Sequence, residues 1–210
     1  MLPPTIPLFP LPNVVLFPNV LLPLHIFEAR YRAMLREALG GDHIIGMVLL
    51  QTRDEANDEG RPPVFSVGCA GVITHAEPLG DGRFNIVLRG IERFRITGED
   101  GGTAYRIAHV DGLPELVSDD HRVELRRLRP RLEALLAAAV ERAGAEPWFP
   151  PAIPDEDLVN ALAQHLELEP LERQALLERE GVLARCRGLI ELLQMHATVS
   201  GNSWKGQSVH

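Results

Sequence analysis

Lysine is almost missing from this sequence of 210 residues, since Lys205 is the one lysine among its 21 basic residues. Acidic residues number 29, which gives a net charge of −8 at pH 7 and an isoelectric point of about 5.5. The acidic excess extends over both halves of the chain. A chain without a basic tail or a basic half has little long-range attraction for nucleic acid or anionic lipid. The composition therefore argues against both as partners.

Cysteine is also scarce, with only Cys69 and Cys186. These two residues lie far apart and form no Cys-x-x-Cys pair, so neither a disulfide framework nor a zinc site is predicted. The histidines include no pair at i and i+4 on a predicted helix, a spacing that would favour a metal site. We expect two buried thiols that pack as small apolar groups, and no metal.

Signatures of catalysis are missing as well. The sequence contains no GxxxxGK[ST] phosphate loop, no HExxH, no GxSxG, and no GxGxxG before a helix. Of its five serines only Ser66 falls in a predicted element, a strand. The acidic runs 54–59 and 155–157 are interpreted as a solvated loop and a helix start, because an acid–base pair would require a cleft. We therefore expect a protein without catalytic residues or cofactors, with an unrecognised hydrolase as an open alternative.

The N-terminus has no charged side chain before Glu28, yet it contains seven prolines in its first 23 residues. A secretory signal needs a basic start and a helical apolar region. A membrane span needs a helix of about 20 residues, and each interior proline costs such a helix roughly 3 kcal/mol. We therefore expect extended segments and turns buried against protein, no membrane span, and a cytoplasmic location.

Residues 1–117 carry the signals of a small β-barrel-like domain. Short β-branched runs, separated by Gly and Pro turns, predict strands over residues 6–8, 20–26, 43–51, 64–79, 83–90, 91–100 and 104–110. Pro23 predicts an edge strand or a bulge, and Gly68 and Gly71 predict a bend or bulge. One early helix is predicted where Tyr31, Met34, Leu35 and Ala38 recur with helical spacing, ending at Gly40–Gly41.

Residues 118–198 are leucine-rich with helical spacing and predict an α-helical bundle, followed by a flexible tail over residues 199–210. Helices are predicted over 122–144, with a kink at Pro130, from about Asp155, from Pro170, and over 182–197. The predicted fold class is α+β. The Pro-rich connection at 145–157 contains Trp148 and Phe149, which either cap the junction of the two subdomains or anchor a partner.

Arginines are the most distinctive polar residues of the strand region. They are predicted to share one face at alternate positions: Arg83, Arg89, Arg93, Arg95 and Arg106. Such a face either is a solvated surface that resists edge aggregation or binds carboxylates and phosphates. A surface for single-stranded nucleic acid is a third reading, against which the acidic net charge weighs.

Two motifs together resemble the N-terminal domain of the ATP-dependent Lon proteases. One is PLFPLPNVVLFPNVLLPLHIFEARY at residues 7–31, and the other is the hairpin pattern formed by Gly80, Gly82, Val87, Leu88, Gly90, Arg93 and Phe94. The segment LVNALAQHLELEPLERQALLE is similar too, so the resemblance extends over roughly residues 5–195. It implies a PUA-like β-barrel subdomain followed by a helical one, with a role in substrate recognition and oligomer assembly.

The sequence departs from full Lon proteases because it has neither the phosphate loop nor a lysine in the context of a Ser–Lys protease. We therefore expect a stand-alone, non-catalytic protein or peptide-binding module, with RNA binding by a PUA-like domain as an alternative and a homo-oligomer compatible with the sequence. The predicted partner contacts are Phe9, Phe17, Phe27, Tyr31, Arg89, Arg93, Trp148 and Phe149.

Overall fold

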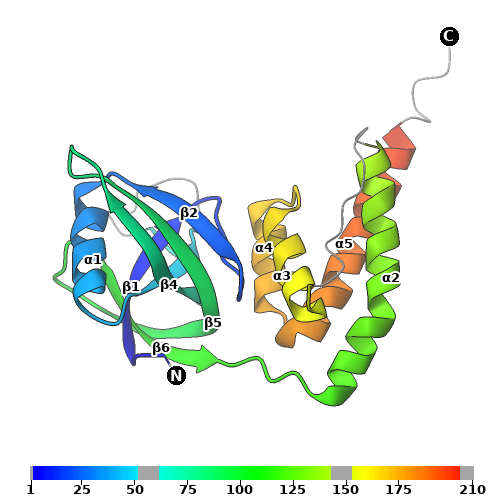
Figure 1. The fold of residues 1–210 in the computed structure, drawn as a ribbon, viewed down its shortest axis with the longest axis horizontal. Helices are drawn as coiled ribbons and strands as arrows, with labels where there is room; N and C mark the ends of the chain where they lie inside the picture. Colours follow the sequence, from blue (N-terminus) through cyan, green and yellow to red (C-terminus); the bar gives the residue numbers. More distant parts are fainter. Residues whose placement is uncertain (1, 52–61, 143–152, 204–210) are drawn as a thin grey trace, which may run out of the picture. The chain divides into compact units, whose positions relative to one another are not determined.

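A computed structural model describes residues 2–51, 62–142 and 153–203. Six strands and one early helix come first, in the order β1 (Thr5–Leu11), β2 (Leu21–Ile26), α1 (Ala29–Gly40), β3 (Ile44–Leu49), β4 (Val67–Pro78), β5 (Phe84–Asp100) and β6 (Arg106–Leu113). Four helices follow, α2 (Asp119–Arg142), α3 (Asp155–His165), α4 (Pro170–Glu178) and α5 (Gly181–Ser203). The predicted α+β class, with strands and one helix before a helical region, is confirmed (Figure 1).

The strand pairings close a ring. β5 pairs with β4, β4 with β3, β3 with β1, β1 with β6, and β6 again with β5. Only the β1–β3 pair is parallel among these; the others are antiparallel. The long β5 makes closure possible because residues 84–89 pair with β2 and residues 93–100 pair with β6 along the same edge. β2 therefore extends the sheet beyond the ring.

Apolar side chains fill the ring. One buried cluster consists of Ile6, Leu8, Val48, Ala70, Phe94, Ala108 and Val110, and it draws on five different strands. Two glycines let backbones approach closely: a Cβ at Gly68 would lie 2.4 Å from the Met47 carbonyl oxygen, and one at Gly90 would lie 2.1 Å from the Phe17 carbonyl oxygen. The predicted irregularity at Gly71 is confirmed by a register shift between Ala70 and Gly71.

Pro23 lies in β2, which pairs with β5 alone among the described strands. The Gly90 N–H donates to the Val20 carbonyl at 2.9 Å. Because hydrogen-bonded pairs recur every second residue in an antiparallel ladder, the backbone groups of Pro23 point away from β5. The missing N–H of proline thus falls on the outer edge, where no ladder partner requires it, and the predicted edge strand is confirmed.

α1 packs the face that its spacing predicts, since Tyr31, Met34, Leu35 and Ala38 are all buried. Gly41 is its C-cap and donates its N–H to the Ala38 carbonyl at 3.1 Å. No basic residue lies in the last turn of this helix.

The predicted hairpin turn is also confirmed, because Gly82 adopts φ +81°, a left-handed conformation that glycine accepts without strain.

The described residues group into two compact units. The strand unit comprises residues 1–115 and 160–178, and the helical unit comprises residues 116–159 and 179–210. Residues 160–178, which include α4, thus accompany the strands, while the sequence-based boundaries at 117 and 198 stay predictions. In the helical unit α2 and α5 lie side by side (Figure 1). None of the helices in the described residues has the length and hydropathy that a membrane crossing requires.

Polar contacts hold α4 against the strands within the strand unit. Gln174 donates its side-chain amide to the Val67 carbonyl at 3.0 Å, and Arg93 donates to the Leu177 carbonyl at 2.9 Å. Arg93 also forms a 2.5 Å ion pair with Glu115, and both side chains are more than four-fifths buried. Because these donors are buried, their loss would leave polar groups without water or partner. α4 is therefore fixed to the ring by specific hydrogen bonds.

Both cysteines are free and buried, as expected. Burial raises the pKa of the Cys186 thiol to about 11, with a smaller contribution from the negative charge of Asp155 and an opposing one from Arg187. Cys186 therefore stays protonated at neutral pH and packs as an apolar group in α5, beside the other predicted core positions of that helix.

Candidate functional site

β2 and the first half of β5 form a two-stranded extension of the ring with two unlike faces. Inward-facing residues Leu22, Leu24 and Ile26 pair with Leu88, Ile86 and Phe84 in register. Outward-facing residues form the surface called here the β2 face: Leu21, Pro23 and His25 opposite Arg89, Val87 and Asn85, with Phe27 directly after the strand. Alternation along the strands explains the division, because successive side chains point to opposite faces.

The β2 face exposes two large apolar side chains, Leu21 at 54% and Phe27 at 59%. The imidazole ring of His25 stacks on the Phe27 ring, with the two ring centroids 6.1 Å apart, and His25 Nδ1 lies 2.8 Å from Asn85 Oδ1. Beside them lies an open hollow of about 330 Å³ lined by Pro23, Leu24, His25, His75, Asn85, Ile86 and Val87. Exposed apolar side chains next to a hollow with few polar groups are typical of a protein-binding surface.

The predicted contact residues separate into two groups. Phe27 and Arg89 are exposed, and both belong to the β2 face. Phe9, Phe17 and Tyr31 are at most 6% exposed, and the rings of Phe9 and Tyr31 pack with centroids 4.5 Å apart. These three side chains form core packing in this structure, and a binding role for them remains a prediction.

Arg93 is buried with its guanidinium engaged by Glu115 and the Leu177 carbonyl, so its charge is matched inside the protein. Trp148 and Phe149 lie outside the described residues. The sequence could not distinguish Arg93 from Arg89, because both are arginines predicted at alternate positions of one strand face. What separates them is α4, which covers Arg93 and comes from a distant part of the chain.

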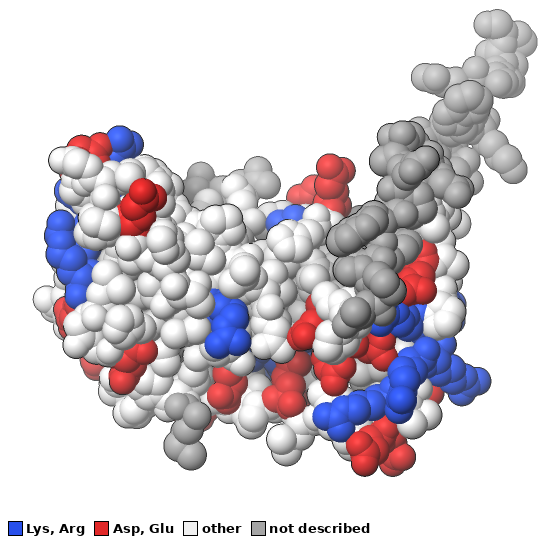
Figure 2. Space-filling view, viewed as in Figure 1, with Lys and Arg blue, Asp and Glu red and all other residues white. Residues whose placement is uncertain are grey.

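Two arginines of the predicted arginine face form ion pairs with carboxylates near them in the sequence. Arg83 pairs with Asp81 at 2.5 Å, and Arg106 pairs with Glu99 at 2.5 Å. On the face drawn in Figure 2, blue side chains gather over part of the helical region with acidic side chains among them, and the surface over β4 and β5 is largely uncharged. Within α2, Arg122 and Arg127 form ion pairs with Asp119 and Glu124.

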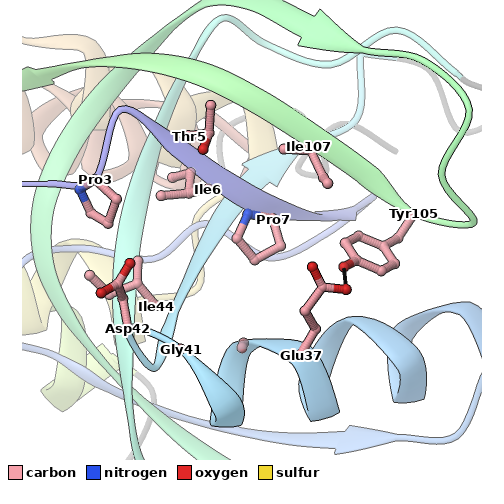
Figure 3. A pocket seen from close by; sticks show the side chains of 11 residues that line it. Pro3, Thr5, Ile6, Pro7, Glu37, Gly41, Asp42, Ile44, Tyr105 and Ile107 are labelled. Carbon is pink, nitrogen blue, oxygen red and sulfur yellow. Dashed lines mark hydrogen bonds between the residues drawn. The ribbon is translucent and has the colours of Figure 1, made fainter.

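Sequence reasoning missed a pocket between β1, the end of α1 and the start of β6, called here the β1–α1 pocket (Figure 3). It has a volume of about 210 Å³ and is lined by Pro3, Thr5, Ile6, Pro7, Glu37, Ala38, Gly41, Asp42, Ile44, Tyr105 and Ile107. The Tyr105 hydroxyl donates a hydrogen bond to the Glu37 carboxylate. Burial, reinforced by this bond and by the charge of Glu37, raises the pKa of Tyr105 to about 12.

A third hollow in the strand unit lies beside the start of α4. It has a volume of about 270 Å³ and is lined by Pro12, Leu49, Leu50, Gln51, Glu169, Pro170 and Leu171. Leu171 is 62% exposed there. Throughout the described part of the chain, no cluster of three or more His, Cys, Asp or Glu side chains is arranged to hold a metal ion.

Comparison with known proteins gives consistent results. The family described as "ATP-dependent protease La (LON) substrate-binding domain" matches residues 5–195. The chain is 27% identical over 197 residues to "Lon protease 2" of Myxococcus xanthus. The aligned region covers 91% of this chain but 24% of that protein.

Two solved structures share the fold. The "N terminal domain of Mycobacterium avium complex Lon protease" superposes with a TM-score of 0.66 at 21% identity, covering 91% of this chain and 99% of that chain. The "Lon N-terminal domain protein from Xanthomonas campestris" has a TM-score of 0.62 at 25% identity, covering 89% of this chain and 97% of that chain. The present chain therefore spans about a quarter of the length of the curated relative in Myxococcus and nearly all of each single-domain structure.

Proposed function

The chain belongs to the family of ATP-dependent protease La (LON) substrate-binding domains, and on that premise we propose that it is a non-catalytic module that binds apolar peptide segments of other proteins through its β2 face. The family description supports a protein substrate. The absence of a phosphate loop and of protease motifs from the sequence supports binding without catalysis.

The observation that carries this proposal is the pair of exposed apolar side chains, Leu21 and Phe27, on one face of β2. Together with Pro23 and the apolar side of Val87 they would bury the side chains of a bound peptide, which is the main source of affinity in such contacts. The exposed Arg89 at the end of the face can add a charge-assisted hydrogen bond to a peptide carbonyl or carboxylate.

Binding through the side-chain face suits β2 better than addition of a peptide strand to its outer edge. Strand addition uses a row of backbone donors and acceptors on an edge. Pro23 removes one donor from the middle of this edge, and β2 has only six residues. The proposed ligand is therefore held by apolar side-chain contacts, with few main-chain hydrogen bonds.

A fluorescein-labelled, reduced and carboxymethylated α-lactalbumin is a suitable probe because it cannot fold. Fluorescence anisotropy should show that it binds the wild-type protein. The double variant Leu21→Ser/Phe27→Ser should weaken binding by about tenfold or more, since each substitution removes an apolar side chain worth roughly 1–2 kcal/mol when half buried.

The matched control is Leu116→Ser/Val123→Ser, which removes two apolar side chains that are 87% and 58% exposed outside the strand unit. It should bind like the wild type. Leu171→Ser tests the hollow beside α4 in the same way. Equal binding by the wild type and the β2-face variant would refute the proposal, and loss in the Leu171 variant alone would assign the role to the other hollow.

A further inference from the structure

The β1–α1 pocket has the size of a single side chain. Its volume of about 210 Å³ is below the 300–1,000 Å³ of typical small-molecule sites. Five of its eleven lining residues are proline or isoleucine: Pro3, Ile6, Pro7, Ile44 and Ile107. An aliphatic stem could therefore pack along this apolar side of the pocket.

The charged side chains of the pocket are all acidic. Glu37 and Asp42 supply two carboxylates, and none of the eleven lining residues is Lys, Arg or His. Figure 3 shows the Glu37 side chain next to Tyr105 and the Asp42 side chain beside Ile44. Pro7 lies between these two pairs of residues in this view. Glu37 and Asp42 are both exposed, and among the described residues neither carboxylate has an ion-pair partner, so two acidic side chains lie at this pocket without a neighbouring cation.

These two carboxylates also oppose the dipole of α1. Glu37 lies in its last turn, and Asp42 follows the C-cap Gly41. Cations stabilise the negative C-terminal end of a helix, whereas carboxylates there cost free energy. No basic residue of the last turn offsets them. Unfavourable carboxylates at the end of a helix are expected mainly at functional sites. Beside a pocket, they suggest that a bound ligand supplies the positive charge that this end of α1 favours.

Tyr105 fixes one of the carboxylates. Its side chain is 8% exposed, and its hydroxyl donates to Glu37. With its pKa near 12, the hydroxyl stays a donor throughout the neutral range. A carboxylate held in this way keeps its direction, so less side-chain entropy is lost when a cation arrives.

We propose that the β1–α1 pocket binds one arginine side chain of a peptide, with its aliphatic stem along Pro7 and Ile44 and its guanidinium at the carboxylates of Glu37 and Asp42. Arginine combines the apolar stem with a planar cation that bonds carboxylates in pairs. The use of this site for substrate choice rests on the proposed peptide-binding function. The binding itself does not, because the pocket shares no lining residue with the β2 face.

The test uses three capped peptides, acetyl-Ala-Ala-X-Ala-Ala-amide, in which X is arginine, citrulline or norleucine. Citrulline keeps the shape of arginine without its charge, and norleucine keeps only the stem. In ¹H–¹⁵N correlation spectra of the full chain, titration with the arginine peptide should move the backbone signals of Gly41, Asp42, Ile44 and Tyr105. The neutral peptides should bind at least about fivefold more weakly, the ratio expected for a partly exposed ion pair.

Glu37→Gln and Asp42→Asn should each weaken arginine binding by roughly fivefold, and Tyr105→Phe should have a smaller effect because it only releases Glu37. The control variants Asp111→Asn and Glu180→Gln each remove one negative charge, as the two pocket variants do, but at exposed residues elsewhere, and each should leave binding unchanged.

Equal binding of the citrulline peptide, or of the Glu37/Asp42 variants, would overturn the arginine pocket. These readouts are separate from those of the β2 face. Failure of the unfolded probe to bind would refute the proposed function while the arginine titration still decides the pocket, and loss of arginine binding would leave the β2-face result intact.

Discussion

The strand unit and the helical unit are stabilised in different ways. In the strand unit, residues far apart in sequence approach each other through glycines and buried polar contacts, as at Gly90 against Phe17 and Arg93 against Glu115. In the helical unit, α2 and α5 pack through repeating leucines, and the Arg129–Asp155 ion pair leaves 20% and 16% of its side chains exposed, against 7% and 14% for Arg93–Glu115. Non-local contacts of the first kind leave little freedom to substitute, whereas a helical stripe distributes its contacts over many side chains.

The largest expected effect is that of Gly90→Ala. The new Cβ would lie 2.1 Å from the Phe17 carbonyl oxygen, so either the β5 backbone or the segment before β2 must move. We expect a loss of about 4 kcal/mol or more in the free energy of unfolding, or no folded strand unit. Gly98→Ala is the control in the same strand, because its Cβ would meet only the His109 side chain at 3.8 Å. Urea unfolding followed by circular dichroism measures both, and equal stability of the two variants would contradict the crowding at Gly90.

A smaller loss of stability is expected when an ion-paired arginine of either unit is replaced, and the loss should be greater in the strand unit. Arg93→Met removes a buried cation and with it one partner of the largely buried Glu115 carboxylate, which should cost about 3–5 kcal/mol. Arg129→Met removes a cation that bonds Glu133 and Asp155 at 2.7 and 2.8 Å, with 20% of its side chain exposed against 7% for Arg93, and should cost less, about 2 kcal/mol. Hydrogen exchange read by mass spectrometry assigns each loss to its unit. A greater loss from Arg129→Met would reverse the comparison.

The smallest effect concerns alkaline pH. Folding raises the pKa of Cys186 from 9.0 to about 11 and that of Tyr105 from 10.0 to about 12, because both groups are buried. The unfolded chain therefore releases these protons first, and the free energy of unfolding falls as pH rises, over pH 9–11 for the helical unit and over pH 10–12 for the strand unit. Stability measured against pH should decline first in the helical unit. Tyr105→Phe should flatten only the later decline, and an unchanged slope in that variant would contradict the assignment.

Much of the secondary structure could be predicted, because the spacing of apolar residues along the sequence indicates which segments are helices or strands and which face is buried. The spacing of Tyr31, Met34, Leu35 and Ala38 gave the buried face of α1, and Pro170 marked the start of α4. The position of α4 could not be predicted in this way. It packs on the ring through Gln174 and Arg93, and nothing in the local pattern of either residue indicates a partner about 100 positions away.

The candidate site was predictable only in part. Phe27 and Arg89 were among the expected contacts, but so were Phe9 and Phe17, which are buried. Aromatic residues beside prolines look alike in sequence whether they face the core or solvent, and the strand register decides which they do. The β1–α1 pocket left one readable signal, the acidic end of α1 without a basic residue in its last turn.

The two stretches that build the strand unit have a consequence for protein synthesis. Residues 1–115 leave the ribosome first, but α4 completes this unit only when residue 178 has emerged. At ~5–20 residues per second the interval lasts roughly 3–13 s. During nearly all of it, neither the Leu177 carbonyl that Arg93 needs nor the Gln174 amide that reaches Val67 has emerged. All strands of the ring are therefore available for pairing several seconds before α4 can bury Arg93 and Gln174, so the ring must persist in this interval without its last helix.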